Sequence, residues 1–175
     1  RVADRAPALH DAWQALTPEL KQDEAMLRLY VGRLVEQGDH AAAEKSSLRA
    51  LTKRWDAQLV RQFGLLQTDH AAKQLSQAEG WLQEHPEDPQ LLVCLGRLCL
   101  REELWGKARD YFESSYRAQV SAETCAELGR LLIGLGEPKV AAAYYREGLA
   151  LSEAQLPELS MPDKVVSNHH LLERD

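Results

Sequence analysis

The sequence repeats itself with a period of 33 residues, and this limits the folds open to the chain more than any other feature. The string Gly-Arg-Leu begins at positions 32, 96 and 129, so its last two copies lie 33 residues apart and its first two lie 64 apart, close to two periods. Leu95 and Leu128 keep the same step. Repeats of about 20–50 residues are typical of solenoids, in which each unit buries its apolar face against its neighbours. We therefore expect a stack of similar units.

Composition indicates that the repeated unit is helical. The chain has 175 residues with 29 Leu and 23 Ala, but only 9 Val and 1 Ile, and aromatic residues make up 6%. Leu and Ala favour helices, whereas strands are enriched in β-branched and aromatic residues. The predicted fold class is all-α.

Each unit has the pattern of two amphipathic helices. In the clearest copy, Asp88 is a suitable N-cap and Pro89 occupies the first helical position. Apolar residues then recur at helical spacing over 91–99 and, after a break, over 104–115. The prediction is a partial upstream helix and linker over 1–22, four helix pairs over 23–54, 56–84, 88–119 and 121–152, and a C-terminal tail over 153–175.

Small residues mark the places where the two helices of a unit cross. Gly96 and Ala108 allow a close approach, and Phe112 fills the adjacent space. The same set recurs one period later. The predicted packing residues are Leu95, Gly96, Ala108 and Phe112 in one unit, and Leu128, Gly129, Ala141 and Tyr145 in the next.

This pattern resembles the tetratricopeptide repeat, or TPR, in which a Leu-Gly pair is followed by Ala after twelve residues and by an aromatic residue four residues later. The usual proline at the end of the unit is replaced by Val120 and Glu153, and the copies over 24–55 and 56–87 are more divergent. The resemblance implies a right-handed α-solenoid that binds other proteins through its concave face.

Longer strings narrow the resemblance. Residues 78–89, followed by 95–99 and 104–108, are similar to the C-terminal repeat region of the HemY proteins, which are bacterial inner-membrane TPR proteins associated with late haem biosynthesis. The similarity covers most of residues 10–152. It implies a hydrophobic anchor upstream of this chain, with the repeats facing solvent, which we expect on the cytoplasmic side. It also implies a scaffolding or haem-precursor-handling role, with haem-synthesis enzymes as partners.

Charge and motifs argue against several other functions. The net charge of −6 argues against nucleic-acid binding, which needs a basic surface. No apolar run approaches the roughly 20 residues that cross a bilayer, so membrane contact is expected only through segments outside this chain. The chain lacks G-x-S-x-G, P-loop and H-E-x-x-H motifs, and its three Cys do not have zinc-site spacing. We predict no enzyme activity, no catalytic residues and no metal site.

The arginines offer a candidate binding site. Arg33, Arg97 and Arg130 each follow a glycine in what would be the first helix of a unit, and Arg101 lies one turn beyond Arg97. In tetratricopeptide arrays that helix lines the concave groove, and guanidinium groups bind carboxylates through paired hydrogen bonds. The alternative is that these arginines pair with glutamates of their own helices, such as Glu127, and contribute little.

Two other functions remain open at this point. One is haem or porphyrin binding, in which the arginines meet the propionates and a histidine, such as one of the adjacent pair His169 and His170, meets the iron. The other is a generic assembly scaffold unrelated to haem. The prediction we favour is a protein-interaction module without a cofactor.

Overall fold

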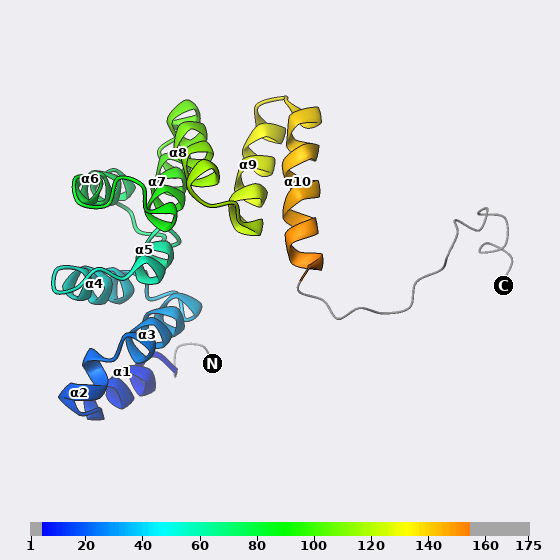
Figure 1. The fold of residues 1–175 in the computed structure, drawn as a ribbon. Helices are drawn as coiled ribbons and strands as arrows, with labels where there is room; N and C mark the ends of the chain where they lie inside the picture. The colour runs from blue at the N-terminus through cyan, green and yellow to red at the C-terminus, as the bar shows by residue number, and fades with distance from the viewer. Residues whose placement is uncertain (1–4, 155–175) are drawn as a thin grey trace, which may run out of the picture.

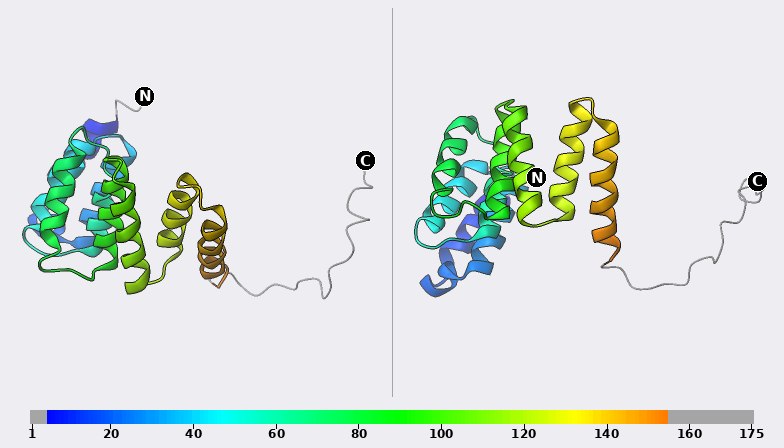
Figure 2. Two further views of the ribbon diagram at one scale, coloured as in Figure 1. Left: turned by 90° about the horizontal axis from the view of Figure 1, so that it is seen from above. Right: turned by 45° about the horizontal axis from the view of Figure 1, so that its top comes forward.

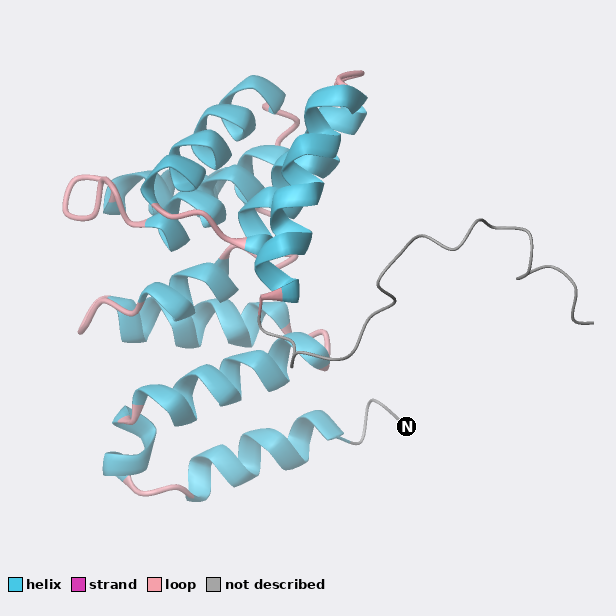
Figure 3. Cartoon of the chain, turned by 45° about the vertical axis from the view of Figure 1, so that its right-hand side comes forward, coloured by secondary structure: helices cyan, strands magenta, loops and turns pink. Residues whose placement is uncertain are grey.

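The computed structural model describes residues 5–154, and within this range the chain forms ten helices and no strand (Figures 1 and 3). The fold is a right-handed α-solenoid of TPR-like helix pairs, as predicted. The helices are α1 (Arg5–Ala15), α2 (Pro18–Gln22), α3 (Glu24–Glu36), α4 (His40–Leu51), α5 (Ala57–Phe63), α6 (Ala71–Trp81), α7 (Pro89–Arg101), α8 (Trp105–Ala118), α9 (Ala122–Gly134) and α10 (Pro138–Glu153).

The predicted unit boundaries can be placed on these helices. The ranges 23–54, 56–84 and 88–119 each contain one helix pair, and the last pair runs one residue past 152. The region 1–22 contains two helices rather than one helix and a linker. The predicted tail, together with His169 and His170, falls outside the described residues from position 155 onward.

The helix pairs form a curved row. We call α3, α5, α7 and α9 the A helices, and α4, α6, α8 and α10 the B helices. Figure 1 shows α3, α5 and α7 on the inner side of the curve, with α4 and α6 on its outer side. The α9–α10 pair stands next to α8 at the C-terminal end, and Figure 2 shows the same order of pairs from above. The A helices therefore line the concave face.

Evenly spaced N-caps set the beginning of every A helix. Asp23, Asp56, Asp88 and Ser121 each accept a backbone N–H bond from the first turn of their helix, and they follow one another at steps of 33, 32 and 33 residues. A side-chain cap satisfies amide groups that have no partner within the helix. These four caps give the repeat its register.

The turns between the A and B helices share a left-handed residue. Gly38, Glu103 and Gly136 have φ values of 80°, 58° and 79°, and each lies fifteen residues after the N-cap of its unit. The next residue donates its N–H to a carbonyl in the last turn of the A helix, over 2.8–2.9 Å in all three units. This is the Schellman arrangement, in which glycine is usual because it has no Cβ. Glu103 adopts the conformation at a steric cost.

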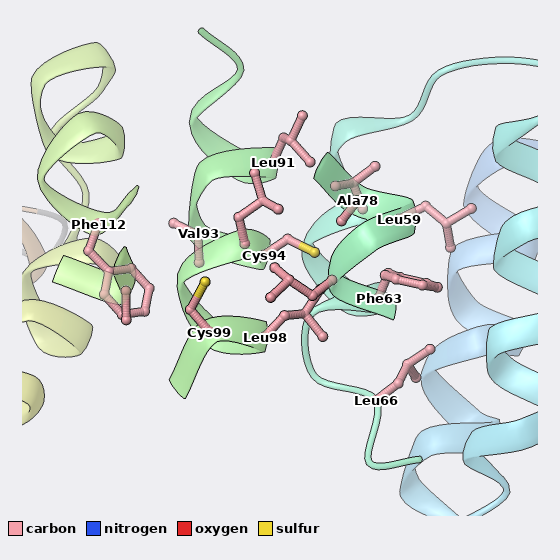
Figure 4. Close-up of a cluster of buried hydrophobic side chains, with 14 of the residues drawn as sticks. Leu59, Phe63, Leu66, Ala78, Leu91, Val93, Cys94, Leu98, Cys99 and Phe112 are labelled. Atoms are coloured by element: carbon pink, nitrogen blue, oxygen red, sulfur yellow. The ribbon is translucent and has the colours of Figure 1, made fainter. Parts of the chain in front are cut away.

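Helix α7 lies at the centre of the core. Eight of its thirteen residues are buried, and they face neighbouring helices in more than one direction. Figure 4 shows Cys94 and Leu98 on the side of Phe63, while Phe112 from α8 lies on the other side of α7. The core cluster extends from Tyr30 to Ala141, so the same apolar interior joins all four pairs.

The glycines of α7 and α9 lie directly against aromatic rings. A Cβ added to Gly96 would lie 2.7 Å from Cζ of Phe112, and one added to Gly129 would lie 2.5 Å from Cε1 of Tyr145. Of the eight predicted packing residues, Tyr145 alone is exposed, at 39%, and the other seven are buried (Leu95, Gly96, Ala108, Phe112, Leu128, Gly129 and Ala141). The two crossings therefore differ in how well they are covered.

The contact between Gly96 and Phe112 gives a first prediction. Gly96→Ala should lower the free energy of unfolding by about 1–3 kcal/mol, because the new methyl group has to displace the ring. Gly80→Ala is the matched control: a Cβ at Gly80 meets nothing within 4 Å, and alanine favours a helix. Urea unfolding of both variants, followed by circular dichroism, should show opposite shifts. Equal stability of the Gly96 variant and the parent would contradict the prediction.

The left-handed conformation of Glu103 gives a second prediction. Glu103→Gly should stabilise the chain by about 0.5–1 kcal/mol, because glycine relieves the strain and this gain exceeds the entropy that it adds to the unfolded state. The neighbouring Glu102 has a φ of −92°, so Glu102→Gly should destabilise the chain instead. Thermal melting of both variants tests the difference. A fall in melting temperature for Glu103→Gly would show that the side chain contributes more than the strain costs.

Candidate interaction surface on the A helices

Ion pairs cross the concave face and join three A helices. Glu123 on α9 accepts a 2.5 Å hydrogen bond from Arg61 on α5 and another of 2.5 Å from Arg97 on α7. Glu127 accepts a 2.8 Å bond from Arg97 and a second bond from Arg130. We call these five residues the inter-repeat ion network. It brings together residues that are up to 62 positions apart in the sequence.

Arg97 and Glu127 are the most buried members of this network. Their side chains are 10% and 5% exposed. Burial by itself would lower the pKa of Arg97, but the hydrogen bonds and charges of Glu123 and Glu127 raise it above its usual value. Burial would also raise the pKa of Glu123, but the hydrogen bonds and charges of Arg61 and Arg97 lower it. The two carboxylates and Arg97 are therefore held in their charged forms by one another.

Arg101 serves the fold of the second helix pair. Its guanidinium group donates to the carbonyls of Leu66 and Thr68, the latter over 2.5 Å, and to Oε1 of the buried Gln74 over 2.8 Å. The two carbonyls belong to the connection between α5 and α6, which lacks the left-handed turn of the other units. Buried carbonyls need a donor, and Arg101 supplies it from the next repeat.

Arg33 and Arg130 remain accessible. Their side chains are 57% and 68% exposed, and each pairs with a glutamate of its own helix, Glu36 and Glu127 respectively. Arg97 and Arg130 lie nine residues after their N-caps, whereas Arg33 lies ten residues after Asp23. One residue corresponds to a rotation of about 100° around a helix. Arg33 is therefore not in the position that the Gly-Arg-Leu string suggested.

These contacts correct the predicted set of partner-binding arginines. Arg97 and Arg101 spend their hydrogen bonds on the protein itself, so they are structural residues in this fold. The alternative that glutamates pair with the arginines holds for Arg130 and Arg33, although the partners of Arg97 lie in the next repeat rather than on its own helix. Arg33 and Arg130 stay as predicted contact residues, and Arg61 is an addition that the sequence analysis missed.

Groups that could bind a metal or haem were sought in the described part of the chain. Within residues 5–154, no three His, Cys, Asp or Glu side chains are grouped to hold a metal ion. Cys94, Cys99 and Cys125 are buried free thiols, and burial raises the pKa of each, to about 11 for Cys99. Buried thiols of raised pKa are poor ligands and poor nucleophiles at neutral pH. Among the described helices, none is long and apolar enough to span a membrane.

The lowered pKa of Glu123 gives a prediction about pH. The folded pKa lies below the usual value near 4.5, so Glu123 stabilises the fold above that pH and loses this effect as the pH falls through the folded pKa. Glu123→Gln should therefore destabilise the chain at pH 7, by about 1–3 kcal/mol, and less at pH 3. Glu36→Gln is the control, because the Glu36–Arg33 pair is exposed and should contribute little at either pH. Equal destabilisation by Glu123→Gln at the two pH values would contradict the assignment.

Sequence comparison finds similarity to HemY. The chain is 22% identical over 152 residues to Protein HemY of Escherichia coli K12 and to the same extent to that of Shigella flexneri, which covers 87% of this chain. The matched segment amounts to 38% of the length of these relatives. No protein-family model matches the chain.

Structural comparison identifies the fold. The chain superimposes on MamA 41-end from Desulfovibrio magneticus RS-1 with a TM-score of 0.57 and 19% identity, over 77% of this chain and 78% of that one. MamA MSR-1 gives a TM-score of 0.54 and 13% identity, over 87% and 91%. MamA is a TPR-like α-solenoid. The chain is therefore a TPR-like solenoid, and its predicted resemblance to the C-terminal repeats of HemY is confirmed.

Proposed function

We propose that this chain is a non-enzymatic protein-interaction module of a membrane-anchored protein associated with late haem biosynthesis. The observation that carries the proposal is the continuous row of A helices, which presents one surface across four repeats. Such surfaces suit an extended peptide or a helix of a partner. The similarity to HemY supports the haem pathway and the bacterial inner membrane as the setting, with the repeats on the cytoplasmic side. The anchor would belong to a part of the protein outside this segment.

The accessible part of the A helices combines charge with apolar surface. Ile133 lies three residues after Arg130 on α9 and is 52% exposed, and Leu29 lies four residues before Arg33 on α3 and is 53% exposed. Residues three or four apart share a face of a helix. Each pair thus joins a guanidinium group to a large apolar side chain, a combination that is enriched at protein interfaces. A helix with acidic and apolar residues on one face would match both pairs.

Site-directed photocrosslinking in cells tests this function. A photoreactive phenylalanine analogue at Ile133 of the full-length protein should trap enzymes of late haem synthesis, identified by mass spectrometry. The control position is Val140 on α10, which is 43% exposed but lies on a B helix. Replacing both Arg33 and Arg130 with Ala should reduce the Ile133 crosslinks and leave the melting temperature unchanged, because exposed arginines contribute little to folding.

Other outcomes would support the alternatives. Identical crosslinks from Ile133 and Val140 would contradict a specific surface on the A helices. Crosslinks to proteins unrelated to haem would favour a generic assembly scaffold. A visible absorption band on adding haemin to the purified protein, lost on replacing His169 and His170 together, would favour haem binding over the scaffold.

A further inference from the structure

A hollow with an apolar floor and a basic rim lies outside the concave face, where α2, the beginning of α3 and the end of α4 meet. Its volume is about 440 Å³. Trp13, Leu27 and Leu59 supply apolar lining, and Lys21, Arg49 and Lys53 supply positive charge. Volumes of this size are usual for sites that hold small ligands or the side chains of a partner.

The acidic residues at this hollow are already neutralised by other groups. Glu24 pairs with Arg54 over 2.7 Å, and Asp56 pairs with Arg28 over 3.2 Å. Arg49 and Lys53, by contrast, form no ion pair or hydrogen bond with the part of the chain that the structure describes. Lys21 donates to the carbonyl of Gln14 over 2.8 Å, which leaves its charge uncompensated. Three uncompensated cations thus gather at one place on a protein of net charge −6.

A second hollow lies on the other side of the same basic residues. It has a volume of about 390 Å³, and Lys53 and Arg54 line both hollows. Its aromatic wall is formed by Trp55, Trp81 and His85, with the rings of Trp55 and His85 stacked 3.7 Å apart. Two apolar recesses are therefore separated by the cationic connection between α4 and α5.

We propose that these two hollows, with the basic residues between them, form a docking site for an acidic peptide segment of a partner protein. Apolar side chains on either side of the acidic residues would enter the two hollows, and the carboxylates would meet Arg49 and Lys53. An extended chain can reach both recesses, whereas a small carboxylate fills one of them. Carboxylates complement the local charge, and the acidic remainder of the surface repels an acidic segment from other positions. The site is separate from the concave surface of the proposed function.

The four tryptophans provide an internal readout for the test. A labelled ten-residue peptide with four central glutamates and one leucine at each end is titrated into the protein, and binding is followed by anisotropy and by the indole N–H resonances. Trp13 lines one hollow and Trp55 and Trp81 the other, so their three signals should shift. Trp105 on α8 lines neither hollow, and its signal should stay in place.

Charge-matched variants separate the site from general electrostatics. Arg49→Glu with Lys53→Glu should weaken peptide binding at least tenfold. Lys45→Glu with Lys73→Glu changes the net charge by the same amount at exposed positions away from both hollows and should retain binding. A peptide with glutamine in place of glutamate should not bind. Loss of binding in both double variants would overturn the proposal, as would absent shifts at Trp13, Trp55 and Trp81. Equal binding of glutarate, with a shift at Trp13 alone, would assign the first hollow to a small carboxylate instead.

Discussion

The burial of α7 on opposite sides is the constraint on which the rest of the solenoid depends. A helix with so many buried residues cannot lie at a surface, so other helices must cover it, and α5, α6 and α8 do so. Two glycines make this possible. Gly96 lets the ring of Phe112 lie against the backbone of α7, and on the other side Gly64 brings the end of α5 so close that a Cβ there would lie 2.7 Å from Cα of Cys94. The third repeat is thus the centre from which the others extend.

The N-cap aspartates also connect successive repeats. The carboxylate of Asp56 caps α5 and pairs with Arg28 of the preceding repeat, and that of Asp88 caps α7 and accepts the indole N–H of Trp55 over 2.9 Å. One carboxylate therefore satisfies the amides of its own helix and a donor from the previous unit. A cap that also contacts the neighbouring repeat couples helix formation to stacking, which is how quasi-one-dimensional proteins acquire cooperativity.

The sequence predicted those parts of the structure that repeat and missed those that depend on contacts between units. The Gly, Ala and aromatic positions could be predicted because each unit uses them in the same way. Arg33 was misplaced because the Gly-Arg-Leu string at 32–34 is shifted by one residue from the register that the N-caps set, and Gly32 makes no close contact comparable with that of Gly96. The spacing of Asp23, Asp56, Asp88 and Ser121 was a signal that could have revealed this shift.

The contacts of Arg97, Arg101 and Arg61 have no counterpart in the local sequence. Their partners lie 26 to 62 residues away, and the curvature of the solenoid alone brings them within reach. The two hollows are likewise formed by residues from several helices and the connections between them. Periodicity reveals which residues face a neighbouring unit, but the choice among several charged partners there is set by the superhelix.

The positive charge of the chain is divided between shape and binding. A buried arginine such as Arg97 is costly to desolvate and is tolerated because two carboxylates meet it, so removing either partner would leave a charge without compensation. That charge holds α7 and α9 together on the concave face and cannot also bind a ligand. Arg49 and Lys53 lie where no carboxylate of the described residues meets them, and their exposed side chains cost the fold little. Charge that the fold does not use is the charge that a partner can recognise, and in this chain much of it lies between the two hollows rather than in the groove.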